Sequence, residues 1–397
     1  MTMELQSINY DFIAPRQIAF GWGRRREIGA LGRALGSRAL VISGLPESVA
    51  TVVVGELQAH LTAAGVSTVV FDTLLHEPET ADVDRIAAQV RAMSVSAGDF
   101  VIGVGGGAAI DLAKAVAAMA TNTESDTVKD YLENVGRDLK LHRDPLPVMA
   151  VPTTAGTGAE ATRNAVISSY DPPFKKSLRD PRLMPQIALV DPELTVSCPP
   201  EVTAASGMDA ITQLIESYIS RKAQPIPQAL ALQGLRMAVP AIVEAVEHGA
   251  SQPAREAMSH AAMLSGLALA NSGLGFAHGV APALGIHCRV PHGVACALML
   301  SEALRVNRQV REAQLARLAH LLYRQSPTQA PAQAVDYLIE QIDTLCQRVG
   351  VPRRLSDVGV GREQIPEVVR SSRGTSMSAN PRDVSDEELT EILERIW

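Results

Sequence analysis

The segment D-F-V-I-G-V-G-G-G-A-A-I-D-L-A-K-A-V-A-A-M, residues 99–119, joins a strand pattern to a helix pattern through three glycines. Asp99–Val104 is a short apolar run typical of a buried strand, and Ala109–Met119 has helical spacing. Between them, Gly105, Gly106 and Gly107 would let the backbone approach a phosphate, and the helix N-terminus would offer N–H groups and a positive dipole end. The segment predicts either a phosphate-binding turn or a plain tight turn between strand and helix.

The first half of the chain repeats this alternation of strand and helix patterns. Such an order predicts a parallel sheet with helices on both faces, so the predicted class is an α/β, Rossmann-like, dinucleotide-binding domain. The other predicted strands are Ile18–Gly23, Arg38–Ser43, Ser67–Phe71, Val148–Val151 and Ile187–Asp191. The other predicted helices are Arg24–Leu35, Val49–Ala64 and Ala81–Ser96.

The second half of the chain contains helix patterns and almost no strand patterns. The change falls at Pro199 and Pro200, so we expect an α/β domain over residues 1–195 and an all-helical domain over residues 196–397. The predicted helices of the second domain are Ala204–Ser220, Pro227–Val246, Pro253–Ala270, Gly293–Val306, Arg311–Leu322, Ala332–Val349 and Asp386–Ile396.

The composition is that of a globular enzyme. The 397 residues are 46% hydrophobic and 20% charged, with a net charge of −7, which argues against binding to nucleic acid or to an anionic membrane. The four cysteines lie far apart without a C-x-x-C pair, which favours reduced thiols over disulfides. The N-terminal residues do not resemble a signal peptide, and no apolar run is long enough to cross a bilayer. We therefore expect a cytoplasmic location.

A second polar motif, V-P-T-T-A-G-T-G-A-E at residues 151–160, follows another predicted strand. Small hydroxyl residues and glycines alternate in it, which suits hydrogen bonding to phosphate or ribose. Together with the glycine turn, this motif favours nucleotide binding. The ordinary Rossmann layout is not supported, because residues 121–128 carry no strand that ends in an acidic residue.

Two histidines, His278 and His292, lie in apolar, small-residue surroundings, each followed by a glycine. A buried imidazole needs a partner, and imidazole is the commonest metal ligand. Asp209, Gln213 and Glu216 share one face of a predicted helix, and Asp209 lies between apolar residues. Asp209 with the two histidines would make a catalytic divalent-metal site. The alternatives are an arginine partner for Asp209 and separately satisfied core histidines.

These motifs together resemble the iron-containing (group III) alcohol dehydrogenases, in the superfamily that includes glycerol dehydrogenase and dehydroquinate synthase. The similarity is closest to lactaldehyde reductase-like members and includes G-G-G-x-x-x-D-x-x-K from Gly105 to Lys114, P-T-T-A-G-T-G-x-E from Pro152 to Glu160, G-x-D-A at residues 207–210 and H-G-x-A at residues 278–281. The resemblance implies a dehydroquinate synthase-like fold, a small alcohol or aldehyde substrate, NAD(P)(H), and Fe²⁺ or Zn²⁺ on Asp209, His278 and His292. The implied dinucleotide contacts are Gly44, Gly105, Gly106, Gly107, Asp111, Thr153, Thr154, Asn164, Lys175, Leu189 and Leu194.

Three positions depart from the family's pattern. Gln213 stands where the family has a fourth metal ligand, a histidine, so we expect Gln213 to be a weaker ligand or to orient a metal-bound water. Pro282 stands where the family has a further active-site histidine, which leaves His287 as a candidate for proton transfer. Gly44 replaces the aspartate with which many NAD-specific members bind the ribose, so we expect NADP(H) to be accepted.

The function indicated by the sequence is a metal-dependent, NAD(P)-dependent alcohol dehydrogenase or aldehyde reductase, and a homodimer or higher oligomer follows from the resemblance. The rivals are a metal-independent reductase resembling maleylacetate reductases, a dehydroquinate-synthase-like lyase, and a non-catalytic binding protein that retains the fold.

Overall fold

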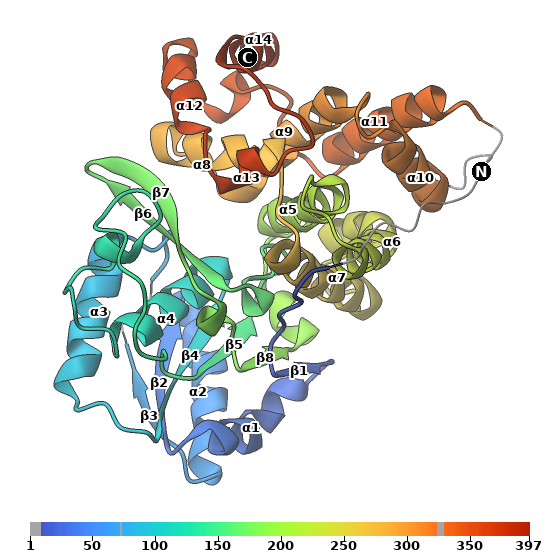
Figure 1. The fold of residues 1–397 in the computed structure, drawn as a ribbon. Coiled ribbons are helices and arrows are strands. Elements are labelled where there is room, and N and C mark those ends of the chain that lie inside the picture. The colour runs from blue at the N-terminus through green and yellow to red at the C-terminus, as the bar shows by residue number, and fades with distance from the viewer. Residues whose placement is uncertain (1–8, 72–73, 324–328) are drawn as a thin grey trace.

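The computed structural model describes residues 9–71, 74–323 and 329–397, which form a sheet-containing half and a helical half (Figure 1). Most of the N-terminal segment in which we found no signal peptide lies outside these residues. The order of elements confirms the predicted class, an α/β half followed by an all-helical half. The last strand of the sheet ends at Val190 and the first long helix begins at Pro200.

The first half contains a six-stranded sheet in which every pairing is parallel, as predicted. The strand order is β1-β8-β5-β4-β2-β3, so the glycine turn after β4 lies near the middle of the sheet. The strands are β1 Gln17–Phe20, β2 Arg38–Ser43, β3 Ser67–Val70, β4 Asp99–Gly105, β5 Val148–Pro152 and β8 Ile187–Val190.

Helices cover both faces of this sheet because alternate strand residues point to opposite sides. Leu40 and Ile42 of β2 join the core beneath α3 and α4, whereas Ala39 and Val41 join the core beneath α1 and α2. These four residues of β2 are all buried, as are all residues of β4, β5 and β8, which explains the continuous apolar runs in the sequence. The covering helices are α1 Ile28–Leu35, α2 Glu47–Ala63, α3 Thr80–Ala92 and α4 Gly107–Met119.

A two-stranded antiparallel hairpin, β6 Asn164–Tyr170 and β7 Pro173–Arg179, projects from the sheet half toward the helical half (Figure 1). The sequence patterns did not predict this hairpin. The hairpin carries Asn164 and Lys175, two of the implied dinucleotide contacts.

The second half is built from ten helices within the described residues. The sequence patterns predicted seven of them and missed α8, α12 and α13. The helices are α5 Pro200–Ile219, α6 Pro225–Glu247, α7 Gln252–Asn271, α8 Phe276–Cys288, α9 His292–Asn307, α10 Glu312–Tyr323, α11 Pro331–Arg348, α12 Ile365–Ser371, α13 Thr375–Ser378 and α14 Asp386–Arg395.

By length and composition alone, α6 is long and apolar enough to cross a bilayer. No other helix among the described residues meets this criterion. Helix α6 packs against α5 and α7, and Leu235, Ala238 and Ile242 on it are fully buried. It is therefore a partly buried core helix of this half.

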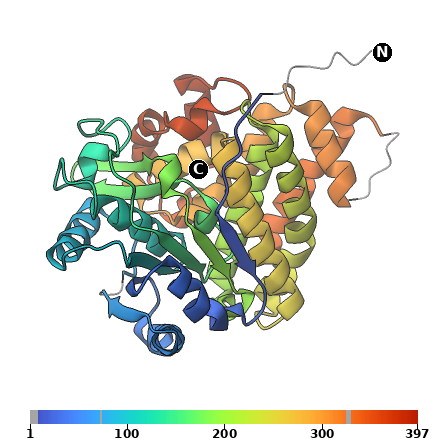
Figure 2. The same cartoon turned by 60° about the horizontal axis from the view of Figure 1, so that its bottom comes forward.

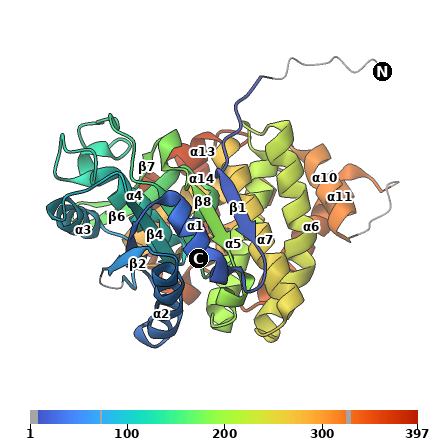
Figure 3. The same ribbon diagram turned by 90° about the horizontal axis from the view of Figure 1, so that it is seen from below.

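The two halves meet along the β1 edge of the sheet. Figures 2 and 3 show β1, in dark blue, lying alongside the helical half, and Ile18 and Phe20 of β1 pack against Met263 and Leu267 of α7. Because Ile18 and Phe20 are alternate residues of β1, this apolar seam covers one face of the sheet at its β1 end and joins the two halves.

At the opposite end of the strands from the glycine turn, Arg38 and Asp99 join β2 to β4. Arg38 Nε and Nη2 lie 2.7 and 2.8 Å from the two Asp99 carboxylate oxygens, and Ser96 N–H donates to Asp99 at 2.7 Å. Burial disfavours the charged carboxylate, but Arg38 and Ser96 on balance lower the pKa of Asp99.

We predict that Asp99→Ala lowers the free energy of unfolding by roughly 3 kcal/mol, because it leaves Arg38 unpaired beside a buried site. Urea unfolding at neutral pH measures this. The pKa of Asp99 is lower in the folded state than in the unfolded state. Its contribution to the free energy of unfolding is therefore complete above the ordinary aspartate pKa, near 4, and is lost as the pH falls below that value. Glu244→Ala, which removes the exposed pair with His248, is the control and should change stability by less than about 0.5 kcal/mol. Equal effects of the two substitutions would contradict the prediction.

Candidate active site

A cleft of about 280 Å³ lies between the two halves. The sheet half contributes Gly107, Asp111 and Lys175 to its lining. The helical half contributes Asp209, His278, Gln213 and His292. The cleft therefore brings Gly107, at the end of the glycine turn, together with the two histidines.

Asp209, His278 and His292 meet in this cleft from three different helices, α5, α8 and α9. Asp209 Oδ1 lies 3.1 Å from His278 Nε2 and 3.9 Å from His292 Nε2. Asp209 and His278 are buried, and His292 retains partial exposure. No Lys or Arg ion pair to Asp209 is found in the described part of the chain, which removes the arginine alternative there. One carboxylate and two imidazoles at these distances suit a divalent cation.

The side chain of Glu216 orients His278. It lies two turns after Asp209 on α5, is fully buried, and accepts from His278 Nδ1 at 2.8 Å, which leaves Nε2 facing Asp209. The same carboxylate accepts the backbone N–H groups of Gly275, Ala277 and His278 at the beginning of α8. A carboxylate is favourable at this position because a helix N-terminus carries unpaired N–H groups and partial positive charge.

The protonation of the two histidines differs. Burial and the nearby charge of Lys175 lower the pKa of His292 to about 4, so its imidazole is neutral at physiological pH. Burial opposes protonation of His278 as well, but Cys296, Asp209 and Glu216 raise the pKa of His278 well above its ordinary value. A metal ion at this site would take the place of the proton on His278, because ligands bind in their deprotonated form.

Gln213 is buried one turn after Asp209, and its amide nitrogen faces two oxygens. Nε2 lies 3.4 Å from Asp209 Oδ2 and 3.3 Å from the Gly156 carbonyl oxygen. If the side-chain amide were flipped, Gln213 Oε1 would face these two acceptor oxygens without a hydrogen between them. The orientation with Nε2 toward them is therefore the chemically reasonable one. Gln213 Oε1 is buried and has no protein partner.

Cys296 belongs to the same cluster, and the sequence analysis missed it. One potential ligand atom each from Asp209, His278, His292 and Cys296 lies within 4.8 Å of all the others. Cys296 Sγ is 3.6 Å from His292 Nε2, and burial raises the pKa of its thiol to about 12. The signal in the sequence was the spacing of four residues from His292, which places both side chains on one face of a helix.

Pro282 and His287 lie on α8 at different distances from the cleft. Pro282 lines the cleft directly, and His287 does not. His287 Nε2 lies 2.7 Å from the hydroxyl of Ser371, which does line the cleft. His287 therefore reaches the cleft only through Ser371.

The predicted dinucleotide contacts lie along the carboxyl edge of the parallel sheet. β2, β4 and β5 end there, so Gly44, Gly105 and Thr153 are neighbours, and Thr153 N–H donates to the Gly105 carbonyl at 2.9 Å. Gly105 has φ +145°, and a Cβ on it would lie 3.1 Å from Gly44 Cα.

Next to this edge, the glycine turn packs closely against the hydroxyl residues of the 151–160 motif. A Cβ on Gly106 would lie 3.5 Å from Thr154 Oγ1, and a Cβ on Gly107 would lie 2.4 Å from Thr157 Oγ1. No side chain caps α4 at Gly106. These features fit a phosphate held by backbone N–H groups and hydroxyls.

The remaining predicted contacts divide into cleft and core residues. Asp111, Asn164 and Lys175 line the cleft. Leu189 and Leu194 are buried in the apolar core beneath α1 and α2 and do not line the cleft, so their contact with a dinucleotide stays a prediction.

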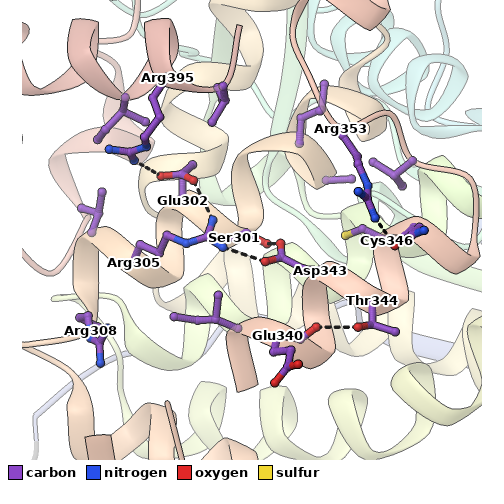
Figure 4. A pocket seen from close by; sticks show the side chains of 18 of the residues that line it. Ser301, Glu302, Arg305, Arg308, Glu340, Asp343, Thr344, Cys346, Arg353 and Arg395 are labelled. Carbon is purple, nitrogen blue, oxygen red and sulfur yellow. Dashed lines mark hydrogen bonds and ion pairs between the residues drawn. The ribbon is translucent and has the colours of Figure 1, made fainter. Parts of the chain in front are cut away.

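A larger cavity of about 1060 Å³ lies in the helical half between α9, α11 and α14 (Figure 4). None of Asp209, His278 and His292 lines it. Arg305 pairs with Glu302 and Asp343, each at 2.7 Å, and Arg395 also pairs with Glu302. Since these charges neutralise one another and no metal-ligand cluster is present among its lining residues, we do not assign the reaction to this cavity.

Comparison with known proteins points to the same kind of chemistry as the residues of the cleft. Residues 15–192 match the family profile "Iron-containing alcohol dehydrogenase", and residues 203–397 match "Fe-containing alcohol dehydrogenase family, C-terminal". The chain belongs to the iron-containing alcohol dehydrogenase family. It is 30% identical to the 1,3-propanediol dehydrogenase of Citrobacter freundii over 98% of this chain and 99% of that one. It is also 30% identical to the lactaldehyde reductase of Escherichia coli over 87% of this chain and 88% of that one.

Solved structures of this family have the same fold. A 1,3-propanediol oxidoreductase superposes with a TM-score of 0.91 at 30% identity, covering 98% of this chain and all of the other. A sulfoacetaldehyde reductase from Bifidobacterium kashiwanohense, solved in complex with NAD⁺, superposes with a TM-score of 0.85 at 29% identity, covering 98% and 99%. This dehydrogenase is therefore a metal-dependent, NAD(P)-dependent oxidoreductase of alcohols or aldehydes.

We predict that Glu216→Gln weakens metal binding by about 10–100-fold, the range typical of a lost outer-shell partner. An amide cannot offer two carboxylate oxygens to the three N–H groups and to His278, and it makes the imidazole less basic. Competitive chelator titration of the purified protein measures the affinity. Glu201→Gln, an exposed residue of the same helix, is the control. Equal metal affinities in the two variants would rule out this role of Glu216.

Proposed function

We propose that this dehydrogenase interconverts small, uncharged alcohols and their carbonyl compounds and accepts NADP(H) as well as NAD(H). The observation that carries the proposal is the cleft, which is lined both by Gly107 at the beginning of α4 and by the Asp209–His278–His292 cluster. When bound, the divalent metal polarises the substrate oxygen, and the nicotinamide exchanges hydride with the substrate carbon.

In this proposal Asp209, His278 and His292 hold the metal, either Fe²⁺ or Zn²⁺. The support is a buried carboxylate beside a neutral His292 and a His278 oriented through its other nitrogen. Gln213 orients Asp209 through Nε2, and its unpaired Oε1 is available to the metal or to a water.

The dinucleotide lies along the carboxyl edge of the sheet. Its phosphates contact Gly105, Gly106 and Gly107 and the hydroxyls of Thr153 and Thr154, as the uncapped beginning of α4 favours. Asp111, Asn164 and Lys175 extend the contacts into the cleft. Lys175 from the hairpin would lie near the reacting groups, because its charge affects His292.

The proposed substrate is uncharged because the cleft offers few free cations to an anion. Three of the cationic side chains that line it are paired with carboxylates. The pairs are Lys175–Glu77, Arg179–Glu133 and Arg373–Asp386. Arg289, at the C-terminal end of α8, does not line the cleft and stacks on Tyr170, with its guanidinium carbon 3.4 Å from the ring centroid.

Proton transfer would use the Ser371 hydroxyl and His287. Pro282 has no proton to exchange, whereas the 2.7 Å contact connects a cleft-lining hydroxyl to an imidazole. A cytoplasmic location and a homodimer remain predictions from the sequence.

The test is a chelation experiment combined with a substrate comparison. We expect activity to disappear on chelation and to return with Fe²⁺ or Zn²⁺, measured by NAD(P)H absorbance. We also expect kcat/KM to be higher for butanal than for succinic semialdehyde, which has the same four carbons with a carboxylate in place of the terminal methyl group. Activity that survives complete metal removal would support the metal-independent reductase, and a preference for the anionic aldehyde would overturn the substrate proposal.

For the dinucleotide, we predict that kcat/KM for NADP⁺ equals or exceeds that for NAD⁺, because residue 44 has no carboxylate to repel a 2′-phosphate. Initial-rate kinetics with both dinucleotides measure this. Stronger discrimination in favour of NAD⁺ would refute the prediction.

The matched variant is Gly44→Asp in an Ala109→Gly background, since a Cβ on Gly44 would lie only 2.7 Å from Ala109 Cβ. Ala109→Gly alone is the control. The aspartate should reduce kcat/KM for NADP⁺ by at least about tenfold relative to NAD⁺, because two like charges about 4 Å apart repel by roughly 4 kcal/mol at an effective dielectric constant of about 20.

A further inference from the structure

We propose that Cys296 is a fourth protein ligand of the metal, so that the site is Asp–His–His–Cys and selects zinc. This inference rests on the metal site of the proposed function. Cys296 is fully buried, is a free thiol, and belongs to the four-residue cluster of Asp209, His278 and His292.

The distances in the cluster match the edges of a tetrahedral site. Zinc–nitrogen bonds of about 2.0–2.1 Å and a zinc–sulfur bond of about 2.3 Å at tetrahedral angles set N and S about 3.6 Å apart and N and O about 3.3 Å apart. Cys296 Sγ lies 3.6 Å from His292 Nε2, and Asp209 Oδ1 lies 3.1 Å from His278 Nε2 and 3.9 Å from His292 Nε2. Small rotations of existing side chains would complete the site.

The helix register directs the thiol to this place. His292 and Cys296 are four residues apart on α9, and Asp209 and Gln213 are four residues apart on α5, which packs against α9. Each helix therefore presents a pair of side chains to the cluster. The family pattern has a histidine on α5 at position 213, and here the additional strong ligand would come from α9.

Gln213 does not replace that histidine well. Its amide nitrogen is engaged by Asp209 and by the Gly156 carbonyl, and an amide oxygen is a harder, weaker ligand than imidazole for Zn²⁺. Its buried Oε1 lacks a protein partner, which indicates that a further group belongs beside this cluster.

Charge favours a thiolate in this environment. With Asp209 as the only anionic ligand, a divalent ion and its direct ligands would carry a net positive charge, and a Cys296 thiolate would neutralise it. The buried Glu216 carboxylate is not a direct ligand and already accepts three N–H groups of α8 and His278 Nδ1. A coordinating thiol is deprotonated by the metal outright. Thiolates also select zinc over harder cations. Zinc accepts a fifth ligand in catalytic sites, so four protein ligands are compatible with the reaction.

The test uses the full chain with cobalt as a spectroscopic substitute for zinc. Metal-free protein loaded with Co²⁺ should show visible d–d bands and, in addition, an intense thiolate-to-cobalt charge-transfer band in the near ultraviolet. Cys296→Ser should lose the charge-transfer band and keep the d–d bands, with Zn²⁺ affinity reduced by at least about tenfold. Cys288→Ser, which removes a thiol of α8 outside the cluster, is the matched control and should retain both features.

The outcomes separate this inference from the proposed function. Cobalt binding without a charge-transfer band in the unmodified protein, which needs no variant to fold, would overturn the assignment of Cys296 and leave the Asp–His–His site intact. A charge-transfer band that survives Cys296→Ser would also overturn it. Absence of any cobalt binding would overturn both the ligand assignment and the metal site.

Discussion

The arrangement of the active site depends on the buried carboxylate of Glu216. It accepts three N–H groups at the beginning of α8 and the Nδ1 proton of His278. Burying the unpaired N–H groups of a helix end in an apolar interior costs free energy, and burying an unpaired carboxylate does so as well. The N–H groups of α8 and the Glu216 carboxylate therefore stabilise one another. One side chain of α5 thus fixes where α8 begins and which nitrogen of His278 faces Asp209. The metal-ligand geometry follows from these contacts between helices rather than from any single segment.

In the sheet half, the parallel direction of the strands determines where the polar loops lie. The strands are all parallel, so their carboxyl ends share one edge, and the polar loops after β2, β4 and β5 converge there. The seam between β1 and α7 holds this half against the helical half, and the hairpin β6–β7 brings Lys175 close enough to affect His292. The cleft lies where the hairpin and the beginning of α4 face α5, α8 and α9.

The sequence predicted the fold class and the meeting of Asp209, His278 and His292, because apolar periodicity and buried polar residues are local signals. It failed where local signals conflict. Gly and Pro within Phe276–Cys288 concealed α8, and Asp171, Pro172 and Pro173 at the turn concealed the hairpin. Cys296 was missed because the predicted helix began after His292, so the two residues were not placed on one face. The orientation of Gln213 depends on the Gly156 carbonyl, which only the folded chain brings beside it.

Two differences from the family pattern, Gln213 and Pro282, belong together with the proposed Cys296 ligand. Gln213 replaces an imidazole and uses its donor on Asp209, while Cys296 places a sulfur atom on the other side of the cluster. Exchanging a neutral nitrogen ligand for an anionic sulfur lowers the net charge of the site and makes it softer. A less positive metal polarises an oxygen less strongly, so the protein's own groups must contribute more to moving the proton. Pro282 offers none, and the nearest connected imidazole is His287 behind Ser371. The proposed zinc site would therefore place the demand for proton transfer on Ser371, which lines the cleft, and on His287 bonded to it.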